Sequence, residues 1–589
     1  MARMDTPLRK PKDTKGTFFR LLSYLGAYKF ILLGVVVLCF GSNILSLLGP
    51  NFAGKAINEA AAGAGKVNFD MVYYYAKRML ICYLCSSIIA ISTSMIMMHV
   101  SKWIARRMRK DIFEKLMRLP VGFFDRNQAG DIISRVSYDV EVVSSCLATD
   151  IVQILNSLVT VVGSMTMMLI ISPILAVVVV FTVPAAITYT TKMRKITRPK
   201  FSLRSKNYGI MNGFVEEMFS GQKTIMAYAY ENRVQERFDT VNQNAADAYH
   251  DANYYGMTMG PTVGMINNVG MGLIAVLGSV FYMFQMVTLG QISSFVLYSR
   301  KFSGPINEIA NIVNELYSAL SAAERVFNLL DQEEEVKDVE NAYVLDEVKG
   351  HVQMEDVKFG YEEGKTIIHK LNLDAQAGKL VAIVGPTGAG KTTIINLLMR
   401  FYDVDSGRIL VDGNEIRTCT RESLRSAYAM VLQETWVFKG TIFENIAYGK
   451  EGATMEEVVA AAKAAHIHPF IERLPEGYQT VISEDGGNIS KGQKQLLTIA
   501  RAMLYNAKML ILDEATSNVD TSTERQIQKA MRELMTDKTC FVIAHSLSTI
   551  QHADHILVVN QGDVVEQGTH EELMAQKGFY YKLYAAQFE

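Results

Sequence analysis

Cysteine and tryptophan are scarce in this sequence, and its net charge is close to zero. Its 589 residues contain 6 Cys and 2 Trp. So few cysteines over such a length argue against a disulfide framework. Cys82 and Cys85 have the spacing of a redox or metal pair, but they lie inside an apolar run, so membrane packing is the better interpretation. The 59 Lys and Arg nearly balance the 60 Asp and Glu, so the net charge of −1 says nothing about partners. No nucleic-acid partner is expected.

Long apolar runs are abundant instead. Hydrophobic residues make up 49% of the chain and charged residues 20%, with a mean hydropathy of +0.12. Such a chain is too apolar for an ordinary soluble enzyme and too charged for one that lies wholly in a membrane. The average hides a division, because the apolar runs end near residue 320 and the remainder has the pattern of a soluble α/β domain.

Six of the apolar runs are close to the length of about 20 residues that crosses a bilayer core. Only a short turn separates the third run from the fourth and the fifth from the sixth, whereas the connections after the second and fourth runs are long. The sequence therefore predicts a polytopic helical membrane domain. The expected spans are residues 30–48, 79–100, 151–171, 174–191, 263–284 and 292–312.

Basic residues indicate which connections face the cytoplasm. Both long connections carry Lys and Arg beside the membrane, such as Arg106 and Arg109 in the first and Arg194 in the second. Residues 1–29 are basic too, and the positive-inside rule places all three segments in the cytoplasm. The tail also has the apolar spacing of an interfacial helix, and no cleavable signal peptide is expected because the first long apolar run starts near residue 30.

The two long connections keep helical periodicity on the way down and back. At about 1.5 Å per residue they would reach roughly 37 Å below the membrane. The first turns at residues 123–131, which begin with Phe123, Phe124 and Asp125, and the second turns near Gly221. Levers that touch another part of the protein and plain solvated helices both fit this pattern.

A glycine-rich loop follows the apolar stretch 380–384 and precedes a helical pattern. Its spacing, Gly385-x-x-x-x-Gly390-Lys391-Thr392, is that of a P-loop. Several backbone N–H groups must meet phosphate oxygens at once, and only a chain without Cβ atoms at the glycines curls so tightly. We expect Lys391 to contact the β- and γ-phosphates of ATP and Thr392 to offer its hydroxyl to Mg²⁺. The loop residues expected to bind ATP are Gly385, Pro386, Thr387, Gly388, Ala389, Gly390, Lys391, Thr392 and Thr393.

Carboxylates and two lone polar residues follow other apolar stretches. The run 509–512 ends in Asp513, which fits a Mg²⁺-holding acid, and Glu514, which fits a base polarising the attacking water. Gln433 could sense the γ-phosphate and the metal, and His545 could contact the γ-phosphate. A lone Gln or His is usually surface or core, but this order around a P-loop makes chance remote. The expected catalytic residues are Glu514, His545 and Gln433, and the expected Mg²⁺ ligands are Thr392, Gln433 and Asp513.

The segment 489–493 completes a resemblance to a known family. With the preceding motifs, the chain resembles an ATP-binding cassette (ABC) exporter half-transporter of the multidrug and lipid-exporting type over nearly its whole length. Its Ile-Ser-Lys-Gly-Gln is similar to the family signature Leu-Ser-Gly-Gly-Gln. The resemblance implies that Ser490, Lys491, Gly492 and Gln493 cap ATP held by an opposite subunit.

The same resemblance implies further roles. Tyr361 would stack on adenine, Glu484 would belong to the exporter X-loop, and residues 517–520 would form the D-loop. Gln433 would be the Q-loop glutamine and His545 the switch histidine. The turns containing Phe123, Phe124, Asp125 and Gly221 would be coupling helices that dock on nucleotide-binding domains.

Four parts are therefore expected. They are a basic tail with an interfacial helix (1–29), a transmembrane domain (30–318), a linker (319–350) and an ABC nucleotide-binding domain of the α/β P-loop type (351–589). The acidic run 331–335 in the linker is interpreted as solvated.

Departures from the family pattern suggest a partner. Ile489 and Lys491 replace the commonest signature residues, and Ser546 stands where Arg is usual. In the family, a chain with an intact Glu such as Glu514 and a diverged signature often pairs with a sister chain bearing the opposite defects. A second half-transporter is expected in any case, and a heterodimer is favoured over a homodimer.

The expected function is ATP-driven export of lipophilic small molecules or drugs across the cytoplasmic membrane, with ATP and Mg²⁺ as cofactors. Met and aromatic residues in the spans suit a polyspecific cavity, although packing explains any single one equally well. Arg300, Lys301 and Glu308 should face a cavity or pair with one another. A lipid flippase or peptide exporter of the same fold remains open, as does an ATP-gated channel or sensor.

Overall fold

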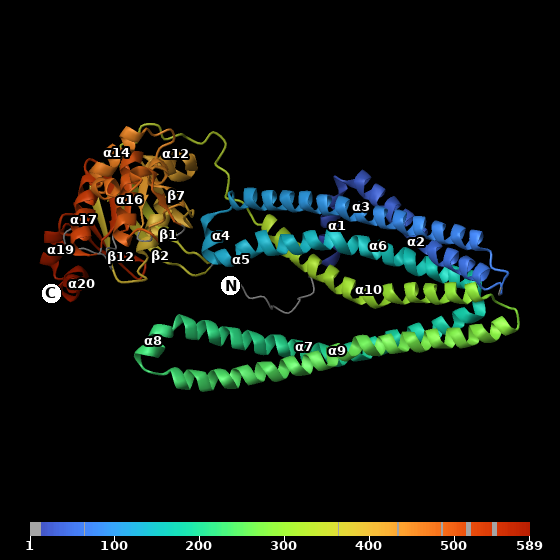
Figure 1. The fold of residues 1–589 in the computed structure, drawn as a ribbon. Coiled ribbons are helices and arrows are strands. Elements are labelled where there is room, and N and C mark those ends of the chain that lie inside the picture. The colour runs from blue at the N-terminus through green and yellow to red at the C-terminus, as the bar shows by residue number, and fades with distance from the viewer. Residues whose placement is uncertain are drawn as a thin grey trace. The chain divides into compact units, whose positions relative to one another are not determined.

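The computed structural model describes residues 13–588 except 64, 363, 433–434, 484–486, 514–519 and 545–549 (Figure 1). Side chains of 306–311, 313–314, 521 and 587–588 are also outside the description. The chain forms two compact units. One contains Met1–Leu119 and Asn127–Glu334, and the other contains Pro120–Arg126 and Glu335–Glu589.

The first unit consists of helices, several of them very long. Five helical stretches are long and apolar enough to cross a membrane, namely 29–60, 69–116, 129–171, 173–220 and 231–283. The sixth expected span falls in α10, which does not meet the same criterion over its described residues, so that span remains a prediction. The helices are α1 (Thr14–Gly26), α2 (Lys29–Ala60), α3 (Phe69–Leu116), α5 (Ala129–Ser134), the π-helix η1 (Arg135–Asp139), α6 (Val140–Ile171), α7 (Pro173–Ser220), α8 (Gln222–Ala227), α9 (Glu231–Met283) and α10 (Leu289–Leu330).

Within this unit α2, α3, α6 and α10 pack together, and α7 runs beside α9 (Figure 1). Small residues bring α2 and α10 close: a Cβ on Gly54 would lie 2.4 Å from the carbonyl oxygen of Gly290. Close approach through small residues is the usual packing of membrane helices, because lipid offers no hydrophobic drive for their association.

The expected linker differs from the observed one. α10 continues to Leu330, so the first part of 319–350 is helix. Residues 331–334 of the acidic run are exposed, and two of them also form ion pairs. In the first unit Arg20 lies 2.5 Å from Asp331 and Lys115 lies 3.1 Å from Glu334. Sequence alone could not show this, because the basic partners come from remote parts of the chain.

The second unit is built around a ten-stranded sheet of order β5-β4-β1-β2-β12-β11-β3-β10-β9-β6. The neighbours β11, β3, β10, β9 and β6 are parallel, and β5, β4, β1 and β2 form an antiparallel part. The strands are β1 (Val352–Phe359), β2 (Ile368–Ala375), β3 (Leu380–Val384), β4 (Ser406–Val411), β5 (Asn414–Glu415), β6 (Tyr428–Val431), β9 (Met509–Asp513), β10 (Thr539–Ile543), β11 (His555–Asn560) and β12 (Asp563–Gly568), with β7 (Gly440–Thr441) and β8 (Val481–Ile482) as a separate pair.

Helices cover both faces of the parallel strands, which explains the unbroken apolar runs of β3, β9 and β10. Alternate residues of β3 enter different cores: Ala382 and Val384 face one, Val381 and Ile383 the other. The helices of this unit are α4 (Val121–Arg126), α11 (Lys391–Leu398), α12 (Arg421–Ser426), α13 (Ile442–Ala447), α14 (Met455–Ala464), α15 (His468–Glu472), α16 (Lys491–Tyr505), α17 (Thr521–Met535), α19 (His570–Gln576) and α20 (Phe579–Phe588), with short 3₁₀ turns η2 (Ile416–Thr418) and η3 (Gly477–Gln479).

Candidate nucleotide-binding site

Four adjacent parallel strands end at the same edge of the sheet. In the register, Ile383 of β3 lies beside Ile543 of β10, Ile543 lies beside Asp513 of β9, and Leu512 lies beside Val431 of β6. The carboxyl ends of parallel strands are where α/β proteins bind ligands. The P-loop follows β3 directly, so this edge brings it beside Asp513.

Gln433, Glu484, Glu514 and His545 lie outside the described residues, as do residues 517–519 of the expected D-loop. Three of them follow the described ends of β6, β9 and β10 closely in sequence. Their assigned roles therefore remain predictions, made from sequence position.

The P-loop needs its glycines. Gly388 and Gly390 have φ angles of 82° and 106°, which L side chains rarely adopt. At Gly385 a Cβ would lie 2.1 Å from the carbonyl oxygen of Val559 on the neighbouring β11. α11 starts immediately after Gly390, so its unpaired N–H groups and positive dipole end face the loop. Such a turn forms an anion cradle that a side chain at these positions would obstruct.

Lys391 closes this loop. Its Nζ donates hydrogen bonds to the carbonyl oxygens of Gly385 (2.7 Å) and Pro386 (3.1 Å). Burial lowers the pKa of Lys391, and the nearby carboxylate of Asp513 opposes that change. A cation beside a carboxylate and the hydroxyl of Thr392 at the start of α11 together make a donor set that fits a phosphate chain with Mg²⁺.

Tyr361 lies against the P-loop helix. The Nδ2 of Asn396 donates to its hydroxyl (3.1 Å), and that hydroxyl donates to Thr393 Oγ1 (3.3 Å). Its ring meets the ring of Tyr402 edge-on, with centroids 4.9 Å apart. The ring expected to stack on adenine is thus held by α11 and by a second aromatic residue.

The signature segment caps α16. Ser490 Oγ accepts the N–H of Gln493 (3.2 Å), while Gln493 Oε1 accepts the N–H of Ser490 (2.8 Å), which is a capping box. Ser490 is exposed and Gly492 is buried. The atypical Ile489 packs against the apolar core on α16. The segment therefore presents a hydroxyl and a helix N-terminus to solvent, while its first residue serves packing.

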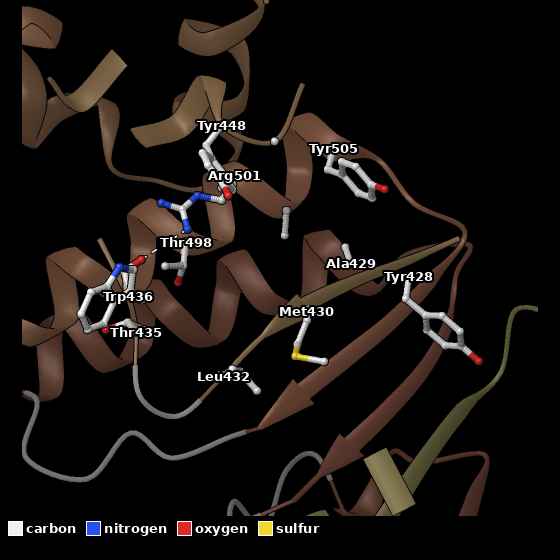
Figure 2. A pocket seen from close by; sticks show the side chains of 12 residues that line it. Tyr428, Ala429, Met430, Leu432, Thr435, Trp436, Tyr448, Thr498, Arg501 and Tyr505 are labelled. Carbon is white, nitrogen blue, oxygen red and sulfur yellow. Dashed lines mark hydrogen bonds between the residues drawn. The ribbon is translucent and has the colours of Figure 1, made fainter. Parts of the chain in front are cut away.

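A pocket of about 280 Å³ lies beside the strand that leads to Gln433 (Figure 2). Met430 on β6 and Trp436 line one side, and Arg501 and Tyr505 on α16 line the other. Trp436 is 65% exposed, which is unusual for so large an apolar side chain. Arg501 Nε donates to the carbonyl oxygen of Asn445 (2.9 Å), so the pocket wall is held rigidly.

The first expected turn forms the short helix α4, which belongs to the second unit. Phe123 is buried, whereas Phe124 is 41% exposed. Asp125 accepts a hydrogen bond from the hydroxyl of Tyr402. A Cβ on Gly122 would lie 2.9 Å from the Tyr402 ring, so a glycine is required for this close contact. Tyr402 was not among the expected site residues, although an aromatic residue just after the P-loop helix is a signal that the sequence contains.

The second expected turn lies in the first unit. Gly221 separates α7 from α8, and its N–H bonds the carbonyl oxygen of Glu217 (2.9 Å). Large apolar side chains around this turn are exposed: Phe219 by 74%, Met226 by 61% and Tyr228 by 78%. Such a cluster at the tip of a hairpin is typical of a contact surface.

An ion-pair cluster holds the connection into the second unit. Arg421 is buried and pairs with Asp338 (2.8 Å) and Asp403 (3.2 Å). Arg425 pairs with Glu335 at 2.5 Å. Asp403 follows the P-loop helix at the same turn as Tyr402, so the linker and α4 both meet one short segment.

Two family models match the chain. The model described as ABC transporter transmembrane region matches residues 29–306, and the model described as ABC transporter matches residues 368–517. The second match contains the P-loop, the signature segment and Asp513.

Known proteins resemble the chain over most of its length. An uncharacterised ABC transporter ATP-binding protein of Bacillus subtilis, YfiC, is 42% identical over 584 residues, 98% of this chain and 96% of the relative. A fatty acid ABC transporter ATP-binding/permease protein of Mycobacterium tuberculosis is 46% identical over 477 residues, 81% of this chain and 75% of the relative. A solved structure of a bacterial Atm1-family ABC exporter with ATP bound has a TM-score of 0.75 at 28% identity, covering 95% of this chain and 98% of that one.

Proposed function

Because the chain belongs to the ABC transporters, we propose that it is one half of a dimeric exporter that couples ATP hydrolysis to outward movement of lipophilic molecules. It is a membrane transporter ATPase with a helical membrane domain and a cytoplasmic ATP-binding domain. The observation that carries the proposal is the P-loop, with Lys391 beside Asp513, in the same chain as apolar helices long enough to span a bilayer.

For hydrolysis, we propose that the P-loop N–H groups and Lys391 bind the phosphates of ATP. The hydroxyl of Thr392 and the carboxylate of Asp513 would hold Mg²⁺, which when bound neutralises charge on the phosphates. Glu514 would polarise the attacking water, with Gln433 and His545 near the γ-phosphate. The roles of Lys391, Thr392 and Asp513 are supported by their position, because β3 and β9 end at the same edge of the sheet.

A second half-transporter completes each site in this proposal. Ser490, Lys491, Gly492 and Gln493 would cap ATP held by the other chain. The exposed hydroxyl of Ser490 at the N-terminus of α16 suits a phosphate, because N–H groups there lack helical partners.

For coupling, we propose that α4 and the turn at Gly221 transmit nucleotide-dependent motion to the membrane helices. The hydrogen bond from Tyr402 to Asp125 supports the role of α4. For the second turn, the support is chemical: large apolar side chains at its tip are exposed, as is typical of a contact surface.

The substrate class proposed is a hydrophobic small molecule or a lipid-like amphiphile that the protein takes from the bilayer. The relative named a fatty acid ABC transporter supports this class. A lipid flippase of the same fold is the alternative within the class. An ATP-gated channel would differ in one measurable way: it would pass its substrate down a gradient without turnover.

Inside-out vesicles carrying the protein test the proposal. We expect ATP-dependent accumulation of a lipophilic dye, which Lys391→Ala abolishes by removing phosphate binding. Glu514→Gln should keep ATP binding but lower phosphate release by at least about a hundredfold, the size of a general-base effect. Near-normal phosphate release by Glu514→Gln would refute the catalytic assignment. Dye movement that persists in Glu514→Gln, which should bind ATP without turnover, would favour an ATP-gated channel instead.

A further inference from the structure

A lysine lies among three helices of the membrane unit. Lys301, on α10, donates hydrogen bonds from Nζ to the carbonyl oxygen of Ser46 (2.8 Å) and to its hydroxyl (2.5 Å), both on α2. The ring of Tyr83 on α3 lies under the same ammonium, with 5.6 Å from Nζ to the ring centroid. Among the described residues, every contact of the ammonium is therefore to a neutral group.

The position of Lys301 relative to the membrane can be judged from its contacts with α2. Ser46 lies in the middle of α2, an apolar helix of 32 residues that is long enough to cross a bilayer. Two further hydrogen bonds fix α10 against the same part of α2: Tyr298 to the carbonyl oxygen of Leu47 (2.6 Å) and Ser294 to that of Pro50 (2.7 Å). By the expected spans, Lys301 lies near the middle of residues 292–312, whereas Ser46 lies toward one end of residues 30–48.

A cation at this depth has a substantial cost unless an anion compensates it. Within the described part of the chain, no carboxylate pairs with Lys301, and it is half-buried. A lysine kept only to join two helices could be replaced by any neutral donor without that cost. The ammonium of Lys301 has no anionic partner among the described side chains, which do not include Glu308.

Further polar side chains lie close to Ser46 along α2 and on the neighbouring α6. Asn43, one turn before Ser46 on α2, donates to Asn156 Oδ1 on α6 (2.8 Å) and accepts from Thr160 (2.8 Å). Around them the exposed side chains of α2 and α3 are apolar, such as Ile44 and Leu84. A polar level bordered by apolar surface suits an amphiphile whose head is polar and whose tail is not.

We propose that Lys301, with Ser46 and the hydroxyl of Tyr83, binds the anionic head group of a single-chain amphiphile during export. The shared chemistry is one anionic group, carboxylate or phosphate, which an ammonium recognises as a compact charge with three donors. This inference rests on the proposed export function and specifies the substrate class for it.

Binding of defined probes to the purified full-length protein in nanodiscs tests the site. Palmitate, hexadecyl phosphate and the neutral hexadecanol share one chain length. We expect Lys301→Gln to weaken palmitate at least about tenfold and to change hexadecanol less than about twofold, because only the anions lose a charge-assisted hydrogen bond. The ratio of losses for palmitate and hexadecyl phosphate shows which anion the site prefers. Lys301→Arg should keep most of the affinity.

Arg300 provides a matched control. It is the adjacent residue, it carries the same charge, and it is exposed. Arg300→Gln should leave the affinity for the anions within about twofold of the original protein. The proposal is overturned by equal losses in both variants, by unchanged palmitate binding in Lys301→Gln, or by equal loss of palmitate and hexadecanol, which a merely structural role would cause.

Dye transport separates this proposal from the export function. Lys301→Gln should still accumulate a neutral lipophilic dye in vesicles with ATP, because hydrolysis does not involve Lys301. Loss of palmitate affinity with retained dye transport supports the head-group site. If the original protein transports no lipophile, the export function fails, yet the binding comparison still decides the role of Lys301.

Discussion

The hydroxyl of Tyr402 donates a 2.5 Å hydrogen bond to the carboxylate of Asp125, a residue 277 positions away in the chain. Burial and this bond raise the pKa of Tyr402 well above its ordinary value, so the phenol remains a donor at physiological pH. The same ring packs edge-on against Tyr361. A single aromatic residue thus contacts both the residue expected to stack on adenine and the helix α4.

The first prediction concerns this contact. Tyr402→Phe keeps the ring and removes only the hydroxyl, so ATP binding at Tyr361 should be unchanged. Transport per ATP hydrolysed should fall about two- to tenfold, the factor for one hydrogen bond of about 0.5–1.5 kcal/mol. Dye accumulation and phosphate release, measured on the same vesicles, give this ratio. Asp125→Asn should have a similar effect, and an unchanged ratio in both variants would show that α4 is not held through Tyr402.

The second prediction separates the two neighbouring phenylalanines of α4. Phe123 is 8% exposed and Phe124 is 41% exposed. Phe123→Ala removes a buried ring and should lower transport more than basal ATPase, by a larger factor than Phe124→Ala. The comparison uses the same transport and phosphate assays. Equal effects of the two variants, or a strictly proportional fall of transport and ATPase, would contradict the lever interpretation.

Local chemistry could be predicted from sequence, because it depends on residues close together in the chain. The P-loop, the carboxylate at the end of β9 and the capping signature all have fixed spacing, and the structure places Gly388, Gly390 and Ser490 in the expected conformations. The ABC exporter fold is confirmed, since the resemblance depends on several such motifs in one order.

Contacts between remote residues could not be predicted in this way. Nothing in the local pattern says that Tyr402 meets Asp125, or that Lys301 bonds Ser46. The ion pairs of the acidic run 331–335 could not be predicted for the same reason, because charge density alone does not reveal where a basic partner lies. Helical periodicity also continues through Leu330, where a change of composition suggested a linker.

The third prediction concerns Arg421, which is buried and pairs with Asp338 and Asp403. Arg421→Ala removes one of the two buried cations of the cluster, while Arg400 still pairs with Asp403 (2.8 Å) and Asp338 (3.8 Å). We expect it to destabilise the nucleotide-binding domain by about 1–3 kcal/mol, the cost of leaving buried polar groups without a partner. Thermal unfolding of the full-length protein in detergent measures the loss. Arg408→Ala is the control, because Arg408 forms an exposed pair with Glu355, for which about 0–1 kcal/mol is expected. Equal losses of stability in both variants would show that the buried ion pairs contribute no more to stability than an exposed pair does.

The fourth prediction concerns the second chain of the dimer. Glu514 is present in this sequence, whereas Ile489 and Lys491 depart from the usual signature. We therefore predict a non-identical partner that carries the more usual signature and lacks an effective base. The efficient site would combine Lys391, Asp513 and Glu514 with the partner's signature. The site capped by Ser490 would bind ATP and hydrolyse it poorly.

Expression of this chain alone tests that prediction. In detergent we expect little ATPase activity and no stimulation by lipophilic compounds, because a second copy of this chain would supply only the atypical signature. The packing of Ile489 against the core argues the other way, since it shows that this atypical residue is compatible with an intact capping helix. A stable homodimer with full, drug-stimulated activity would therefore replace the heterodimer with a symmetric exporter. Lys491→Gly would then discriminate further, because a serviceable signature should gain little from the usual residue, whereas a defective one should recover activity.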